Sequence, residues 1–110
     1  MLRVVIVDDE APARKRLGKL LQPMIDAGRV DLVAEAGDGV EALAILNARH
    51  VDLAFLDIKM PELSGFETLE RVSPERRPFV VFTTAYSEHA VTAFERAVEE
   101  VTEPARRLID

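Results

Sequence analysis

Carboxylates stand directly after two apolar runs of this sequence. Asp8 and Asp9 follow residues 4–7, and Asp57 follows residues 51–56. Two unit charges about 4 Å apart repel by roughly 4 kcal/mol at an effective dielectric constant near 20, so three clustered carboxylates call for a counter-charge. Mg²⁺ suits such oxygen ligands. With the cation held by the acidic pair, Asp57 can act as a nucleophile toward phosphorus, and a threonine hydroxyl nearby can donate to a phosphoryl oxygen.

The elements that must position these acids alternate between strands and helices. Short apolar runs predict strands at residues 4–7, 30–36, 51–56 and 79–82. Helices are expected after each of them, starting near Pro12, Asp38, Ser64 and Ser87. This order predicts a parallel sheet with helices on both faces, and such sheets bind ligands beyond the carboxyl ends of their strands. The acids converge there if the first, third and fourth strands are neighbours.

Local signals mark several helix ends. Asp38 and Glu41, three residues apart, predict a capping box, and Ser64 predicts the N-cap of the next helix. Pro12 suits a first helical turn, and Gly28 lies where the first helix should end.

Composition restricts the function classes. The 110 residues suit a single domain, and their 48% apolar and 31% charged content is typical of a globular protein. The chain has no cysteine, which excludes a disulfide scaffold, a thiolate zinc site and a cysteine nucleophile. With 14 Lys+Arg against 20 Asp+Glu, a net charge of -6 argues against direct nucleic-acid binding. No apolar run spans a membrane and no secretory signal is evident, so a cytoplasmic protein is expected.

Three motifs in order resemble the receiver domain of bacterial two-component response regulators. They are Val-Ile-Val-Asp-Asp-Glu at 5–10, Asp-Ile-Lys-Met-Pro at 57–61 followed by Gly65, and Phe-Thr-Thr-Ala at 82–85. Residues 36–39 and 41–43 match as well, and residues 82–91 with 93–95 are similar to receivers attached to LytTR DNA-binding domains. The resemblance covers residues 2 to about 95.

The resemblance implies a flavodoxin-like, doubly wound α/β fold with strand order 2-1-3-4 before a fifth strand. It implies that Asp57 accepts a phosphoryl group from a histidine kinase or phosphotransfer domain. Asp8, Asp9 and Asp57, with the backbone carbonyl of Lys59, would hold Mg²⁺, and Thr84 would be the switch hydroxyl. Such a domain is a signalling switch, and its chemistry is limited to its own phosphorylation and dephosphorylation.

The sequence departs from this family after Phe94. Receivers continue with an apolar fifth strand that carries an aromatic residue and ends in Lys-Pro, whereas here Glu103 precedes Pro104. Apolar residues recur at helical spacing at positions 90, 94, 97, 98 and 101. They predict a helix from Ser87 to about Val101 in place of the fifth strand. The single domain, residues 1–110, would then consist of receiver-like βα units at 1–86 and a remodelled helical segment at 87–110.

Such a segment leaves the fourth strand as a sheet edge, which a homodimer formed through this segment would cover. A frameshift, a redesign and a natural degenerate receiver are all compatible with the change. An alternative function is a pseudo-receiver, an interaction or dimerisation module that never uses phosphate. A magnesium-dependent phosphatase is disfavoured, because its second acid should lie two residues after the nucleophile of the first strand.

Two minor features have simpler interpretations. The basic run at residues 14–16 is interpreted as a solvated helix face, in preference to a docking surface for a phosphotransfer domain. His50 and His89 are interpreted as surface residues, because neither has a ligand partner at metal-binding spacing.

Overall fold

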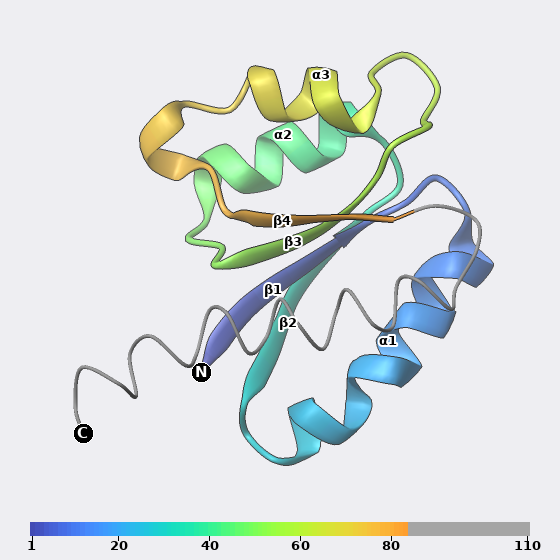
Figure 1. Cartoon of the computed structure of the whole chain (residues 1–110), viewed down its shortest axis with the longest axis vertical. Coiled ribbons are helices and arrows are strands. Elements are labelled where there is room, and N and C mark those ends of the chain that lie inside the picture. Colours follow the sequence, from blue (N-terminus) through green and yellow to red (C-terminus); the bar gives the residue numbers. More distant parts are fainter. Residues whose placement is uncertain (84–110) are drawn as a thin grey trace.

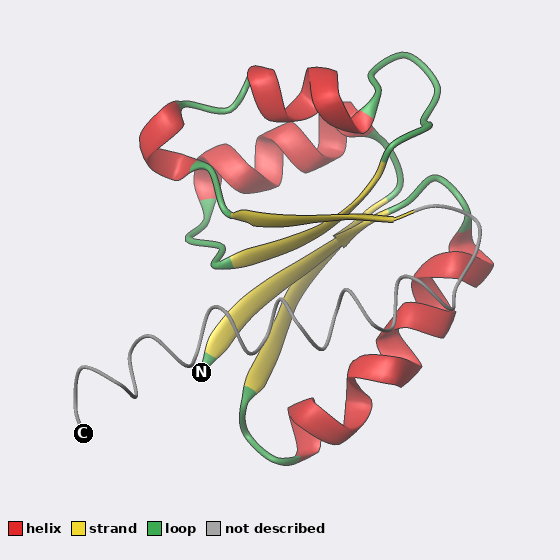
Figure 2. Ribbon diagram, viewed as in Figure 1, coloured by secondary structure: helices red, strands yellow, loops and turns green. Residues whose placement is uncertain are grey.

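The computed structural model describes residues 1–83, which form a parallel sheet with helices on both faces (Figures 1 and 2). The strands are β1 (Leu2–Val7), β2 (Val30–Ala36), β3 (Leu53–Asp57) and β4 (Phe79–Thr83). The helices are α1 (Ala11–Asp26), α2 (Gly39–Ala48) and α3 (Gly65–Glu70), followed by a 3-10 turn at Pro74–Arg76. The predicted alternation of strands and helices is confirmed as far as β4. None of the helices within this part of the chain is long and apolar enough to cross a membrane.

The strand order is β2-β1-β3-β4, and every pair is parallel. Val7 of β1 pairs with Leu56 of β3, and Asp57 of β3 pairs with Thr83 of β4. The carboxyl ends of β1, β3 and β4 are therefore neighbours, as the convergence of the acids requires. The predicted fold class is confirmed. The predicted helix from Ser87 and the predicted loss of the fifth strand lie outside the described residues.

Side chains of the central strands alternate between two cores, one on each face of the sheet. On one face, Val4 and Ile6 of β1 pack with Leu53 and Phe55 of β3 and with Leu17 and Leu21 of α1. On the other face, Val5 and Val7 of β1 pack with Ala54 and Leu56 of β3 and with Ala42 and Leu46 of α2. Each fully buried aliphatic side chain contributes about 1.5–3 kcal/mol. Burial on both faces explains why these strands are continuously apolar.

The first helix follows its predicted signals. Pro12 lies in the first turn of α1, and Gly28 follows the helix with a φ of 73°, in the left-handed region that glycine tolerates. Pro23 lies inside the helix, and its carbonyl accepts a hydrogen bond from the N–H of Ala27 at 3.1 Å.

The capping predictions are confirmed for α3 and half wrong for α2. Ser64 and Glu67 form a complete capping box at α3. At α2 the Asp38 side chain accepts from the N–H of Glu41 at 2.7 Å, as predicted. The Glu41 carboxylate, however, accepts from the N–H of Gly37 at 3.3 Å, so it secures the loop one residue before the N-cap.

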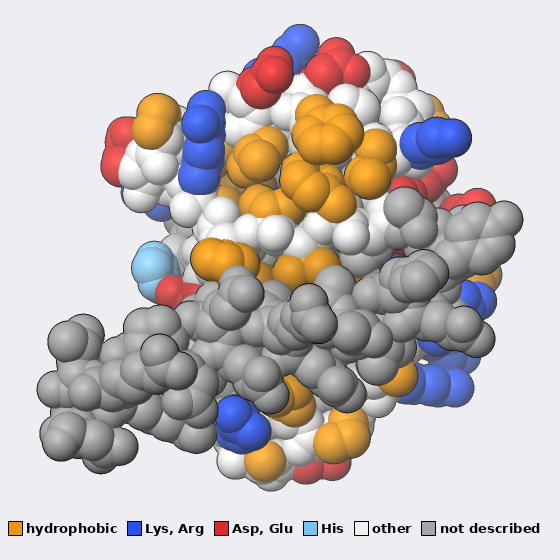
Figure 3. Space-filling view, in the orientation of Figure 1, with side chains coloured by type: hydrophobic (Ala, Val, Ile, Leu, Met, Phe, Trp, Pro, Cys, Tyr) orange, Lys and Arg blue, Asp and Glu red, His pale blue; other side chains and the backbone are white. Residues whose placement is uncertain are grey.

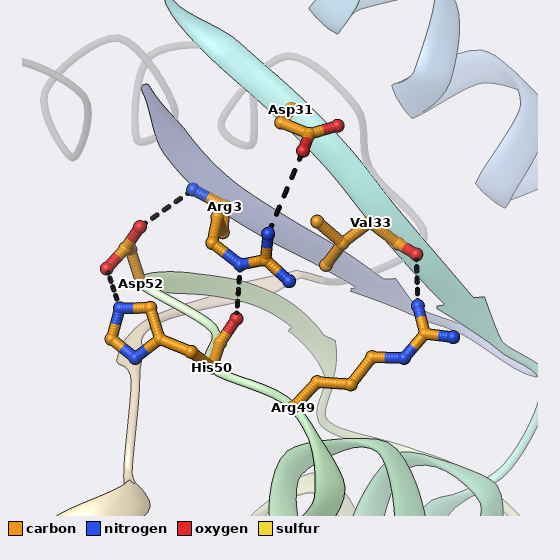
Figure 4. A network of polar contacts seen from close by, with 6 residues as sticks. All are labelled: Arg3, Asp31, Val33, Arg49, His50 and Asp52. Carbon is orange, nitrogen blue, oxygen red and sulfur yellow. Dashed lines mark hydrogen bonds and ion pairs between the residues drawn. The ribbon is translucent and has the colours of Figure 1, made fainter.

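The third strand begins at Leu53, two residues later than predicted, because Asp52 is engaged in a polar network at the amino ends of β1 and β3 (Figure 4). Its carboxylate accepts from the N–H of Arg3 at 2.8 Å and contacts His50 Nε2 at 2.8 Å. The Arg3 side chain donates Nε–H to the carbonyl of His50 at 2.8 Å and lies 4.0 Å from Asp31. We call these four residues the amino-rim network. His50 lies on the surface, as predicted.

Aromatic side chains lie on the outer side of α3 and β4. The rings of Phe66 and Phe82 are 4.6 Å apart between centroids, and Phe66 and Phe79 are exposed. Figure 3 shows hydrophobic side chains gathered on this face of the molecule.

Candidate metal centre

Three carboxylates converge at the carboxyl ends of β1 and β3. One oxygen from each of Asp8, Asp9 and Asp57 lies within 4.8 Å of the others. Asp8 and Asp57 are half-buried, and Asp9 is exposed. Because β1 and β3 are paired in register up to Val7 and Leu56, the next residue after each of these, Asp8 and Asp57, lie side by side. We call these three carboxylates the acidic triad.

Backbone hydrogen bonds hold Asp8 in place. Its N–H donates to the carbonyl of Ala36 at 3.1 Å, which continues the pairing of β1 with β2 for one more residue. Its carboxylate accepts from the N–H of Glu10 at 2.9 Å, so the loop turns around the Asp8 side chain before α1 begins. The position of Asp8 thus follows from the sheet and from the start of the helix.

Asp57 is the last residue of β3 and leads into the loop that runs to α3. Its carboxylate accepts a long hydrogen bond of 3.4 Å from the N–H of Lys59. The N–H of Ile58 donates to the carbonyl of Thr83 at 3.3 Å. Thr84, the next residue, lies outside the described part of the chain. The role of the Lys59 carbonyl as a metal ligand stays a prediction.

The loop after Asp57 folds back closely on the strand. The N–H of Gly65 donates to the carbonyl of Ile58 at 3.0 Å, and a Cβ at this position would collide with the backbone carbonyl of Asp57. Only glycine fits this approach without a backbone shift. Leu63 is buried and donates its N–H to the carbonyl of Pro61 at 2.8 Å. The loop therefore anchors the end of β3 to the start of α3.

The negative charges of the acidic triad repel one another. Burial, followed by the negative charge of Asp8, raises the pKa of Asp57 from 3.8 to about 6. Burial also raises the pKa of Asp8, with further contributions from the charges of Asp9 and Glu10, while the Glu10 N–H and Arg14 act in the opposite direction. These shifts show that the site disfavours its own negative charge, and a bound cation would relieve that strain.

The donor set fits a hard divalent cation. Three carboxylate oxygens within 4.8 Å of one another match the ligands that Mg²⁺ takes, together with waters. Nitrogen or sulfur ligands, which softer metals select, are not part of this group. The three described acids can therefore hold a metal ion, and Mg²⁺ as that ion stays a prediction.

Sequence reasoning missed the role of Arg14. This side chain is only 24% exposed, its Nη1 donates to the backbone carbonyl of Asp8 at 2.6 Å, and its Nε lies 4.0 Å from Glu35. The interpretation of Arg14 as part of a solvated helix face is wrong. Its spacing was the available signal, because Arg14 precedes Leu17 and Leu21 by three and seven positions and so shares their buried face.

A cavity of about 410 Å³ lies beside the acidic triad. It is lined by Ala11, Arg14, Lys15, Glu35, Gly37 and Glu41. None of the three triad carboxylates lines it, so this cavity and the acidic triad are adjacent but separate.

The fold and the acidic triad define a parallel α/β domain with a cluster of carboxylates at the carboxyl ends of its strands. The model of the response regulator receiver domain family matches residues 4–102, and the chain belongs to this family. The transcriptional regulatory protein BtsR of Salmonella typhi is 44% identical over 95 residues, which are 86% of this chain and 38% of that protein. BtsR of Escherichia coli K12 is 42% identical over the same extent. The LytTR-associated type inferred from the motifs agrees with these relatives.

Solved structures lead to the same family. The response regulatory domain of mrkE from Klebsiella pneumoniae is 28% identical, with a TM-score of 0.69 over 96% of this chain and 99% of that one. A complex of the P1 domain of CheA3 with CheY6 from R. sphaeroides matches at 31% identity and a TM-score of 0.65, over 91% of this chain and 75% of that one. The chain spans about two fifths of the length of the curated relatives it matches.

Proposed function

We propose that this receiver domain accepts a phosphoryl group on Asp57 in a Mg²⁺-dependent reaction and thereby controls an output. The observation that carries the proposal is the acidic triad, whose oxygens lie within 4.8 Å of one another at the carboxyl ends of β1 and β3. An isolated aspartate at a strand end would serve equally well as a helix cap. Three converging carboxylates, among which burial and the charge of Asp8 raise the pKa of Asp57, are difficult to explain as structural groups.

Asp57 is suited to the nucleophilic role. Its pKa of about 6 leaves it mostly ionised near neutral pH while keeping it more basic than an ordinary aspartate. A carboxylate oxygen attacks the phosphorus of a phosphohistidine, a P–O bond forms, and the P–N bond breaks. The electron pair of that bond goes to the imidazole nitrogen, which takes up a proton.

The neighbouring residues would supply the remaining functions. Asp8 and Asp9, with the backbone carbonyl of Lys59, would hold the cation beside Asp57. When bound, Mg²⁺ neutralises carboxylate charge and stabilises the negative charge that develops on the phosphoryl oxygens. The hydroxyl of Thr84 would donate to a phosphoryl oxygen and report its presence to the rest of the domain.

A histidine kinase or a phosphotransfer domain is the proposed donor. The family supports this, as does the solved complex of CheY6 with the P1 domain of CheA3. The output is proposed to be transcriptional, because the BtsR relatives are transcriptional regulatory proteins. Phosphorylation would shift the balance between two conformations of the domain.

The lysine that the family carries at the end of the fifth strand is absent here, so the rate at which Asp57 is phosphorylated is informative. A lysine at this position would contact the phosphoryl group, and no lysine follows Phe94 in this chain. We therefore expect slower phosphorylation than in receivers that keep it, with the same acceptor. The other candidate, a pseudo-receiver that binds partners without using phosphate, is favoured by this same departure. A homodimer formed through residues 87–110 is part of that proposal, and a monomeric mass in solution would contradict it.

Phosphorylation by a small donor tests the proposal. The protein is incubated with acetyl phosphate and MgCl₂, and intact mass measures the gain of one phosphoryl group. We expect modification of the native chain, almost none of Asp57→Asn, and strong inhibition by EDTA or by Asp9→Asn. Asp31→Asn at the opposite rim of the sheet is the matched control and should behave as the native chain. Mg²⁺ binding without any phosphoryl gain would favour the pseudo-receiver instead.

A further inference from the structure

Arg14 connects the acidic triad to the neighbouring part of the sheet. From α1, its Nη1 reaches the backbone carbonyl of Asp8 at 2.6 Å, and its Nε lies 4.0 Å from Glu35 of β2. We propose that Arg14 is a positioning residue that orients the Asp8–Asp9 peptide, so that both carboxylates can share one cation with Asp57. This inference rests on the proposed function only in assuming that the triad binds Mg²⁺.

The contact acts on the backbone, which is why it affects both acids. The N–H of Asp8 is held by the carbonyl of Ala36 at 3.1 Å, and its carbonyl is held by Arg14 at 2.6 Å. The N–H of Asp8 belongs to the Val7–Asp8 peptide and its carbonyl to the Asp8–Asp9 peptide, so the two hydrogen bonds fix the peptide planes on both sides of Asp8. The contact from Arg14 is the one that restrains the Asp8–Asp9 plane. The direction in which the exposed Asp9 side chain leaves the chain depends on that plane. A hydrogen bond from a charged guanidinium is shorter and stronger than one between neutral groups.

Electrostatics alone would make Arg14 an unfavourable neighbour for a cation site. Its charge lowers the pKa of Asp8, so its electrostatic effect extends to a carboxylate that would bind the metal. A positive charge at this place repels a second cation, and its removal should tighten Mg²⁺ binding if charge were all that mattered. The positioning role makes the opposite prediction, and the sign of the change therefore separates the two.

The geometry also distinguishes arginine from lysine. A guanidinium presents donors on several nitrogens in a rigid plane, so one side chain can reach the Asp8 carbonyl and Glu35 together. A lysine ammonium keeps the charge but carries all of its donors on one nitrogen. We therefore expect Arg14→Lys to restore the native behaviour only partly.

The first experiment measures Mg²⁺ affinity of the full chain by calorimetric titration. Arg14→Met should weaken binding about tenfold, the size of effect seen when partners that orient metal ligands are removed. Arg16→Met, which removes an exposed charge from the same helix, should change the affinity by less than about twofold. Unchanged or tighter binding by Arg14→Met would overturn the proposal.

The second experiment needs no metal and measures amide hydrogen exchange by NMR in EDTA. In Arg14→Met, protection of the Asp8 and Glu10 amides should fall about tenfold, while amides of β3 keep their native protection. A uniform loss across the sheet would indicate general destabilisation and would contradict a positioning role, as would unchanged protection at Asp8.

The two readouts keep the proposals separate. If the native chain binds no Mg²⁺, or Asp9→Asn binds it equally well, the metal-dependent function fails while the exchange data still decide the role of Arg14. If the native chain binds Mg²⁺ and Arg14→Met binds it as tightly or more tightly, the positioning role fails and the proposed function stands.

Discussion

Both ends of the sheet carry aspartates, but the groups that surround these aspartates differ in charge and in hydrogen bonding. In the amino-rim network, the Asp52 carboxylate accepts from the N–H of Arg3 and contacts His50, each at 2.8 Å. In the acidic triad, three carboxylates lie within 4.8 Å of one another, and Asp57 accepts one long hydrogen bond of 3.4 Å. One end compensates its negative charge, and the other concentrates it.

The difference separates structural from functional use of the same residue type. A carboxylate that already has hydrogen-bond and charge partners stabilises the fold, and a bound cation would add little to it. An uncompensated cluster costs stability, and the binding of a cation can offset that cost. The comparison predicts that removing an aspartate lowers stability at the amino rim and raises it at the carboxyl rim.

The largest effect is expected from Asp52→Ala. The substitution leaves the half-buried N–H of Arg3 without its side-chain acceptor, so the free energy of unfolding should fall by about 2 kcal/mol. Asp52→Asn keeps an acceptor oxygen and should cost less than about 1 kcal/mol. Urea unfolding measures both. Equal losses in the two variants would mean that the charge of Asp52, and not its hydrogen bond, stabilises this rim.

Much of this comparison could be predicted from the sequence. The buried strands and the convergence of Asp8, Asp9 and Asp57 follow from apolar periodicity and from the rule that parallel strands end at one edge. The capping partner of Glu41 and the role of Arg14 could not be predicted in the same way. Each depends on which backbone group lies within reach of a long side chain, and that is decided by how two loops pack.

The amino-rim network shows the same limit. A run of apolar residues from Val51 predicts a strand, yet Asp52 is drawn into hydrogen bonds with Arg3, 49 positions earlier in the chain. Such a contact between distant residues has no periodic signature. Residues beyond Thr83 carry the prediction of a helix in place of the fifth strand, which stays a prediction.

Asp57→Asn should produce the second effect, with the opposite sign. In the folded state the pKa of Asp57 is about 6, against 3.8 for the free side chain, so the fold favours the protonated form. Stability from this group is fully present below pH 4 and is lost as the pH rises through 6. At pH 7 without metal, Asp57→Asn should raise the free energy of unfolding by about 1 kcal/mol, after allowance for solvent screening of this partly exposed group.

Urea unfolding in EDTA at pH 5 and pH 7 measures this prediction. The native chain should lose stability between the two values through Asp57, and Asp57→Asn should lose less. Asp31→Asn, at the amino rim, should keep the native pH dependence. Excess Mg²⁺ should reverse the order at pH 7, because only the native chain retains the full acidic triad and gains stability from binding. A destabilised Asp57→Asn in EDTA would show that the triad is compensated after all.

The smallest effect is expected from His50→Ala, and it sharpens the description of the amino rim. The His50 ring contacts Asp52 at 2.8 Å, but its side chain is 76% exposed, so the pair should contribute about 0.5 kcal/mol or less. The carbonyl of His50, which accepts from Arg3 Nε at 2.8 Å, is unchanged by the substitution. Urea unfolding at pH 7 should therefore barely distinguish the variant from the native chain. If the free energy of unfolding fell as much as in Asp52→Ala, the imidazole ring, and not the backbone contacts of Arg3, would be what stabilises the amino-rim network.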